Sequence, residues 1–171
     1  SAIIDGNRVF LVEVQALVVA SGYGMAKRNF VGVDSNRANL MIATIEKSLN
    51  IRLGDKDIFL NIIGGLKVNQ PSIDCAIIMA ILSSLRDQAN REKVGLIGEV
   101  GLAGEVRPVP GIDKRLAELD KMGFSMCFIP SKNMTGLDLS EIKLSVIGVS
   151  HVEDLITRYF QEAKRVCERV G

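Results

Sequence analysis

Residues 98–111 of the chain read GEVGLAGEVRPVPG. The glycines at positions 98, 101 and 104 have the spacing of a nucleotide-binding loop. Such a loop needs a helix directly after the glycines, whereas residues 105–109 have the composition of a strand. We therefore interpret the segment as a β-hairpin, and we expect no ATP to bind to this chain.

An amphipathic helix is expected directly after the hairpin. Residues 112–122 place Leu116, Leu119 and Met122 on one side and charged residues on the other. This spacing is typical of a helix that packs by one face. Gly123 then ends the helix as a C-cap.

Before the hairpin, the pattern predicts a strand and an apolar helix. Residues 57–63 read DIFLNII and end at Gly64-Gly65, a turn too short to cradle a phosphate. Pro71 suits the first turn of a helix, because its missing N–H would be unpaired there anyway. The helix from Pro71 to about Leu85 is apolar nearly all round, which is typical of a helix packed on several sides.

The remaining elements complete an alternating pattern of strands and helices. We predict strands over residues 9–19, 30–33, 94–97, 126–129 and 144–147, and a glycine-containing loop or hairpin turn over 20–29. A helix capped by Asp34 or Ser35 is expected to bury Leu40, Ile42, Ile45 and Leu49, and a closing helix over 152–170 to turn Lys164, Arg165 and Arg169 outward. The alternation indicates α/β layers around one mixed sheet, in a single domain over residues 1–171.

The composition is that of an ordinary globular domain. Hydrophobic residues make up 47% of the 171 residues and charged residues 24%, which excludes disorder by composition. The net charge of +1 gives no general attraction to nucleic acid or to an anionic membrane. The longest apolar run, residues 75–82, is too short for a bilayer, and no secretory signal opens the chain. Because the first residue is Ser1, we interpret the chain as a piece of a longer protein.

The cysteines and the histidine do not suggest a metal site. Cys75, Cys127 and Cys167 match neither a zinc spacing nor a disulfide framework. We expect them to be buried free thiols of a cytoplasmic protein. His151 is expected at the surface, in the first turn of a helix, and no metal is predicted to bind.

Several motifs, taken together, resemble two related families. The segment 98–111 resembles the region of Lon proteases that carries the catalytic lysine, and Pro71-Ser72 stands where these proteases carry the nucleophilic serine. Nearly the whole chain is similar to the C-terminal domain of the bacterial DNA-repair ATPase family RadA, also called Sms, in the phrases LVEVQALV (residues 11–18), GVDxNR (32–37), GGL (64–66), SSLRD (83–87) and GEVGLAGEVRPV (98–109). The resemblance implies an α/β fold of the Lon-type (S16-like) proteolytic domain, a mixed sheet with layered helices.

The resemblance also implies a degenerate catalytic dyad. Ser72 occupies the nucleophile position, but Asp113 stands where the lysine base belongs. A Ser–Lys dyad depends on an amine that loses its proton near neutral pH, and a carboxylate with a pKa of about 4 is a much weaker base. Lys114 points about 100° further round the helix, and Lys67 lies on the preceding loop. We expect no proteolysis, with a peptidase using Ser72 and a displaced lysine as the alternative.

The resemblance to RadA implies a hexameric, ATP-dependent DNA motor that acts in recombination and repair together with a RecA-type recombinase. The zinc motif and RecA-like ATPase core of that family are absent from residues 1–171, so ATP, Mg and Zn are expected to bind elsewhere in the longer protein. The resemblance implies that this chain is a non-proteolytic scaffold that contributes to ring assembly and DNA binding. A pure oligomerisation module is a further alternative.

Basic residues supply the candidate contacts to DNA. Each could equally be a solvated surface charge, but several on one face suffice for phosphate contact. The fold could bring Lys27, Arg28 and Arg37 together. The full candidate set is Lys27, Arg28, Arg37, Arg107, Lys114 and Arg115.

Overall fold

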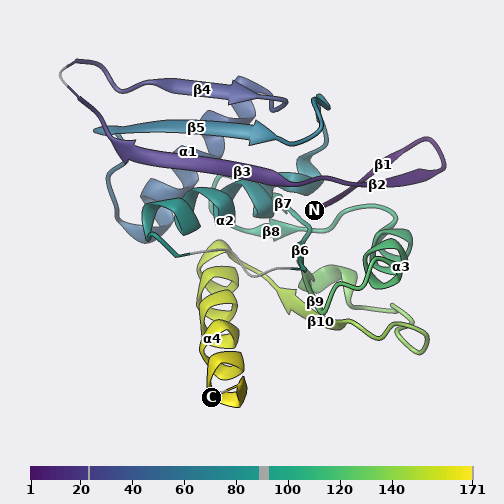
Figure 1. The fold of residues 1–171 in the computed structure, drawn as a ribbon. Helices are drawn as coiled ribbons and strands as arrows, with labels where there is room; N and C mark the ends of the chain where they lie inside the picture. Colours follow the sequence, from purple (N-terminus) through teal and green to yellow (C-terminus); the bar gives the residue numbers. More distant parts are fainter. Residues whose placement is uncertain (23, 89–92, 171) are drawn as a thin grey trace.

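The computed structural model describes residues 1–22, 24–88 and 93–170, and for residues 162–170 it describes the backbone alone. The predicted outward side chains Lys164, Arg165 and Arg169 therefore lie outside the described part of the chain, as does the thiol of Cys167. Figure 1 shows a three-stranded sheet on one side, helix α2 beneath it, and a second sheet with α4 beyond that helix.

The N-terminal segment forms a hairpin and a separate strand instead of one long strand. Strands β1 (Ala2–Asp5) and β2 (Arg8–Leu11) make an antiparallel hairpin, and β3 (Val14–Ala20) belongs to another sheet. The prediction of a single strand over 9–19 is therefore wrong. The inward-facing positions change phase at the break, because the half-buried Leu11 is followed directly by the buried Val12.

The first sheet is mixed and has the strand order β3-β5-β4. Strand β5 (Lys56–Ile62) lies within one residue of its predicted position and is antiparallel to β3. Strand β4 (Arg28–Val31) begins two residues before the predicted strand over 30–33 and pairs with β5 in parallel. It therefore does not return along β3, as a simple hairpin would.

Helices α1 (Ser35–Leu49) and α2 (Asp74–Leu85) lie against this sheet and its neighbours. Asp34 caps α1 as predicted, because its carboxylate accepts from the backbone N–H of Arg37 at 2.9 Å. Among the side chains predicted to be buried, Leu40 is 39% exposed and Leu49 is only half-buried. Ile42 and Ile45 are buried as predicted, and Ala38, Met41 and Thr44 complete the described buried face of α1.

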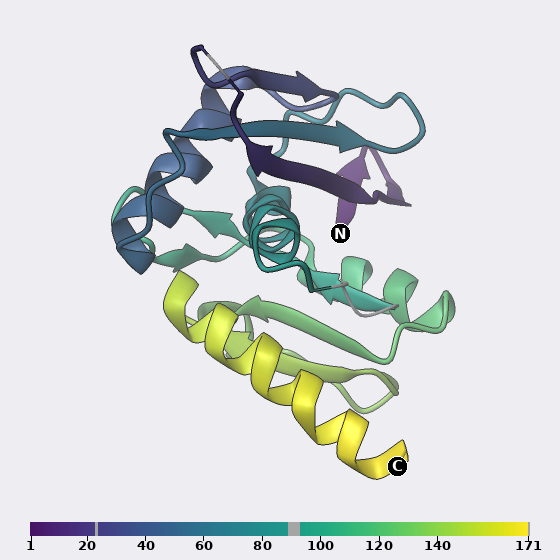
Figure 2. The same cartoon turned by 60° about the vertical axis from the view of Figure 1, so that its left-hand side comes forward.

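Helix α2 is the central helix, as its composition predicts. The short 3₁₀ turn η1 (Pro71–Ile73) leads into it, and it is buried from Asp74 to Ser83. Figure 2 shows α2 end-on between the β3-β5-β4 sheet and the strands below. A helix in this position has no solvent face, which explains the absence of polar periodicity in its sequence.

The second half of the chain forms a parallel sheet and a hairpin. The sheet has the order β10-β9-β6, and the hairpin over the glycine-rich segment pairs β7 with β8 as predicted. The expected single sheet is therefore wrong, since the described strands form two three-stranded sheets and two hairpins. The elements are β6 (Val94–Leu96), β7 (Glu99–Val100), β8 (Val106–Arg107), α3 (Ile112–Lys121), β9 (Met126–Pro130), η2 (Ser131–Asn133), β10 (Ser145–Val149) and α4 (Val152–Val170).

The apolar core is divided into two clusters. The larger surrounds α2, and the smaller lies under α3 and includes Ala2 of β1 together with Leu116 and Leu119. The predicted inward residue Met122 lies beyond the end of α3 and is 54% exposed. The smaller cluster holds β1 close to α3, and this contact shapes the candidate site.

The other predictions on single residues are partly confirmed. Cys75 and Cys127 are buried free thiols. His151 is half-buried and not a free surface group, because its Nε2 lies 2.7 Å from the carbonyl oxygen of Ala103 on the hairpin. Among the residues that the structure describes, no helix is both long and apolar enough to cross a bilayer.

Candidate functional site

A cavity of about 440 Å³ opens beside Ser72, where three segments of the chain meet. These segments are β1, the turn that leads into α2, and the stretch from β8 into α3, and Glu99 of β7 completes the lining. The cavity is lined by Ile4, Gln70, Pro71, Ser72, Glu99, Pro108, Val109, Pro110, Gly111, Lys114 and Arg115.

Ser72 is held firmly at the floor of this cavity. Its side chain lies in the 3₁₀ turn before α2, and the residue is 4% exposed. Its carbonyl oxygen accepts from the backbone N–H of Gly98 at 2.9 Å, and the carbonyl of Gly98 accepts from the N–H of Cys75 at 3.3 Å. These bonds fix the start of α2 to the segment before β7.

The group that contacts the Ser72 hydroxyl is Arg115. Its Nη1 donates to Ser72 Oγ at 3.1 Å, and its Nε donates to the carbonyl oxygen of Pro110 at 3.1 Å. Nη1 also donates to the carbonyl of Ala2, and Nη2 lies 3.4 Å from Gln70 Oε1. Arg115 is 2% exposed, and this burial lowers the pKa of its guanidinium.

The prediction that Arg115 contacts DNA is therefore wrong, because its guanidinium lies inside the protein. The sequence held a signal for this position. Ile112, Leu116 and Leu119 are three residues before, one after and four after Arg115, so Arg115 falls on the apolar face of α3.

Strand β1 is attached across the cavity by a side-chain amide. Gln70 Oε1 accepts from the backbone N–H of Ile4 at 3.1 Å, and Gln70 Nε2 donates to the carbonyl of the same residue. The amide thus pairs with β1 as a neighbouring strand would. Together with the bond from Arg115 to Ala2, it fixes one wall of the cavity.

The two lysines considered as displaced bases, Lys114 and Lys67, line different cavities. Asp113 is exposed and is not among the cavity-lining residues, whereas Lys114 is exposed and lines the cavity of Ser72. Lys67 lines a different cavity, of about 350 Å³, together with Arg37. Lys114 is therefore the lysine that the fold brings to the Ser72 cavity.

Arg37 forms an ion pair with the buried carboxylate of Asp74. Its Nε donates to Asp74 Oδ1 at 2.9 Å and its Nη2 donates to Oδ2, while Asp74 also accepts from the backbone N–H of Val100 at 2.9 Å. Asp74 is fully buried, and the hydrogen bond to this carboxylate raises the pKa of Arg37. The pair joins α1, α2 and β7.

The other predicted DNA contacts do not form one cluster. Arg28 donates to the carbonyl oxygens of Leu53, at 2.7 Å, and Lys56. It lies at the start of β4 with the exposed Lys27, whereas Arg37 follows the other end of that strand. The fold therefore does not bring Arg37 to the other two.

Arg107 is exposed, but it already has acidic partners. Its guanidinium pairs with Glu105 at 2.5 Å and lies 3.7 Å from Glu99. Among the ion pairs of the described residues, neither Lys27 nor Lys114 takes part. These two lysines are the predicted contacts whose charge is most available to a phosphate.

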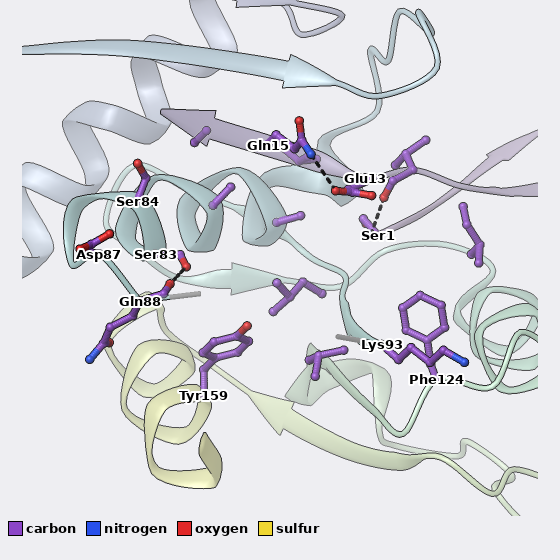
Figure 3. Close-up of a pocket in the computed structure, with 18 residues that line it drawn as sticks. Ser1, Glu13, Gln15, Ser83, Ser84, Asp87, Gln88, Lys93, Phe124 and Tyr159 are labelled. Atoms are coloured by element: carbon purple, nitrogen blue, oxygen red, sulfur yellow. Dashed lines mark hydrogen bonds between the residues drawn. The ribbon is translucent and has the colours of Figure 1, made fainter. Parts of the chain in front are cut away.

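A larger cavity, of about 1120 Å³, lies between β3 and α2 and reaches Tyr159 of α4. Figure 3 shows its polar side chains, with Gln15 bonded to Glu13 at 3.0 Å and Ser83 bonded to the carbonyl of Gln88. None of the site residues predicted from the sequence lines it. Ser72, the residue at the nucleophile position predicted from the sequence, therefore lines the cavity of about 440 Å³ and not this larger one.

A serine at the start of the central helix, facing the β7–β8 hairpin and α3, defines the class as a Lon-type α/β domain. The family model of the Lon protease (S16) C-terminal proteolytic domain matches residues 36–162. The chain belongs to this family, and the predicted fold is confirmed.

The curated relatives make the comparison more specific. The chain is 38% identical over 157 residues to the DNA repair protein RadA of Streptococcus pneumoniae, covering 92% of the chain and 37% of that protein. It is 41% identical over 155 residues to RadA of Halalkalibacterium halodurans (91% and 34% covered) and 39% over 156 residues to RadA of Bacillus subtilis (91% and 34%). The resemblance to RadA is confirmed, and the chain spans about a third of the length of these relatives.

Proposed function

We propose that this chain is a non-proteolytic Lon-like scaffold domain of a RadA-type DNA-repair ATPase, and that it contributes ring assembly and DNA binding. The observation that carries the non-proteolytic part is the hydrogen bond from Arg115 to Ser72 Oγ. A serine nucleophile needs a neighbour that accepts its proton. A guanidinium stays protonated in proteins and has no acceptor atom, so Arg115 cannot fill that role.

A proteolysis assay tests this part of the proposal. We expect purified chain to release no more fluorescence from labelled, unfolded casein than the Ser72→Ala variant does. The two proteins are matched in charge and nearly in volume, so a contaminating protease would affect both equally. Cleavage by the wild type that disappears in Ser72→Ala would contradict the proposal.

A peptidase that uses Lys114 is the second candidate, because this lysine lines the same cavity as Ser72. An amine there could take the serine proton only if it came within hydrogen-bonding distance of Ser72 Oγ. In that case Lys114→Gln would abolish casein cleavage, while Lys67→Gln, in the other cavity, would preserve it. Equal background rates in all three proteins would exclude this candidate.

DNA binding is supported by the names of the relatives, DNA repair protein RadA, and by the exposed cations Lys27 and Lys114. Phosphate contacts release counterions, so binding should weaken steeply as salt increases. We would measure retention of fluorescent duplex DNA between 50 and 200 mM salt, roughly the range over which such contacts lose affinity, with light scattering on the same sample.

The outcomes of this measurement separate the alternatives. A ring-sized species whose DNA binding falls with salt, and falls further in Lys27→Gln, supports the scaffold proposal. A ring that does not retain DNA would leave a pure oligomerisation module. The wider proposal, also by analogy with RadA, is a cytoplasmic protein that works with a RecA-type recombinase and binds ATP, Mg and Zn outside residues 1–171.

A further inference from the structure

Arg115 is a buried cation that the structure does not pair with an acid. None of the ion pairs among the described residues includes it. Its acceptors are neutral: two backbone carbonyls, the Ser72 hydroxyl and the Gln70 amide. Burial of an ion without a counter-ion is unfavourable, so this guanidinium favours an anion beside it.

The one carboxylate that lines the cavity is directed to other cations. Glu99 lies 3.9 Å from Arg37 and 3.7 Å from Arg107. Burial alone accounts for the lowered pKa of Arg115, with no carboxylate opposing it. The charge of Arg115 is therefore not balanced from within the described part of the chain.

The floor of the cavity also retains two unused donor hydrogens. A guanidinium has five N–H groups, and the hydrogen bonds of Arg115 use one on Nε, two on Nη1 and one on Nη2. One N–H on Nη2 remains. The Ser72 hydroxyl accepts from Arg115, and no hydrogen bond of the described residues uses its own proton.

The rim and the walls of the cavity indicate what surrounds these donors. Lys114 adds a second positive charge at the rim. The walls are mostly apolar and come from Ile4, Pro71 and residues 108–110. The volume of about 440 Å³ lies within the usual range for small-ligand sites.

We propose that this cavity binds a carboxylate that carries a small apolar group. One carboxylate oxygen accepts from Arg115 Nη2 and the other from the Ser72 hydroxyl, Lys114 supplies the second charge, and the apolar group lies against the proline-rich wall. A duplex phosphate does not fit this site, because Arg115 is 2% exposed and a DNA backbone cannot reach it. The inference depends on neither DNA binding nor ring assembly.

The same chemistry has two sources, a small free carboxylate and the C-terminal residue of a peptide. Isothermal titration of the chain of residues 1–171 with three probes distinguishes them. The probes are 4-methylpentanoate, an acetylated Ala-Val-Leu tripeptide with a free carboxylate, and the same tripeptide as its C-terminal amide. Saturable binding of either free carboxylate, with the amide at least about tenfold weaker, is the expected result, since a hydrogen-bonded charge is lost.

Variants locate the binding in this cavity. Lys114→Gln removes an exposed charge at the rim and should weaken binding several-fold, and Ser72→Ala should do the same by removing one donor. Lys121→Gln, at the far end of α3, is the matched control and should bind as the wild type does.

Three results would overturn the inference. These are no saturable binding of any free carboxylate, equal affinity for the acid and the amide, and affinity unchanged in both Lys114→Gln and Ser72→Ala. Lys114 is exposed, and Ser72→Ala removes only the hydroxyl of a buried residue, so circular dichroism should confirm that each variant is folded. Binding of the tripeptide alone would identify a peptide end as the ligand, and binding of 4-methylpentanoate alone a small molecule.

Discussion

Arg37 and Arg115 are both held by several hydrogen bonds, but among the described residues Arg37 alone of the two meets a counter-ion. Arg37 meets the carboxylate of Asp74, whereas Arg115 meets carbonyl, hydroxyl and amide oxygens. The first arrangement is a structural ion pair that joins three elements. The second places a permanent cation and donor on Ser72, where a protease would need a base.

The ion pair predicts a large effect of one substitution. Asp74→Asn replaces the negatively charged partner of Arg37 by a neutral amide. The amide also has fewer acceptor sites for Arg37 and for the N–H of Val100. The free energy of unfolding should therefore fall by about 3 kcal/mol. Urea denaturation measures this change. Asp55→Asn is the control, because its contact with Lys56 is at the surface and should contribute less than about 1 kcal/mol. Equal effects of the two substitutions would contradict the assigned role of Asp74.

The buried thiols should be inert in the folded protein. Burial raises the pKa of Cys75, and it raises the pKa of Cys127 to about 12, so the reactive thiolate is disfavoured at both positions. Iodoacetamide at pH 8 should modify these two residues in urea but not in buffer, as read by peptide mass spectrometry. Rapid labelling of either one in buffer would show that the core around α2 or α3 opens readily.

At this scale, the sequence predicted the nucleophile position but not its partner. The start of a helix at Pro71 can be predicted from proline chemistry alone, and this locates Ser72. The contact between Ser72 and Arg115 joins residues 43 positions apart and depends on how α3 packs against β1. No local motif contains that contact, and the helical spacing of Ile112, Leu116 and Leu119 determines only that Arg115 lies on the apolar face of α3.

Among helices and strands, the predictions were correct where the local sequence determines the element. They were wrong where the pairing of strands distant in the sequence determines it. The cap of α1, strand β5 and the buried helix α2 follow from a capping side chain, β-branched residues and uniform apolarity. The partner of β4 does not, because a parallel pairing with β5 depends on the whole sheet. Strand β1 was missed because its four residues carry too little pattern.

The link between β4 and α1 supplies a test at this scale. Gly32 has a φ of +79°, and an added Cβ would lie 2.5 Å from the carbonyl oxygen of Leu66 and 2.9 Å from Ile62 Cβ. Gly32→Ala should therefore lower the thermal midpoint much more than Gly6→Ala. At Gly6 the φ is +57° with nothing within 4 Å, so the expected cost there is the backbone strain of about 1 to 2 kcal/mol. Similar midpoints for the two variants would mean that the β4–α1 link can shift.

At the scale of the whole molecule, α2 joins the two halves of the chain. The β3-β5-β4 sheet lies on one side of it and the β10-β9-β6 sheet on the other (Figures 1 and 2). The cavity of Ser72 is formed where these halves meet, by β1 and the turn into α2 from the first and the β8–α3 segment from the second. Its chemistry is thus a product of the tertiary fold, and a single motif does not determine it.

We propose that the Lon-type fold of this chain presents Ser72 without a general base. The most direct measurement is incubation of the native chain with a fluorophosphonate probe, followed by peptide mass spectrometry at Ser72, with Lys114→Gln in parallel. We predict no adduct at Ser72 in either protein after long incubation. A stoichiometric adduct on wild-type Ser72 that is lost in Lys114→Gln would contradict the absence of a base and establish a displaced catalytic lysine.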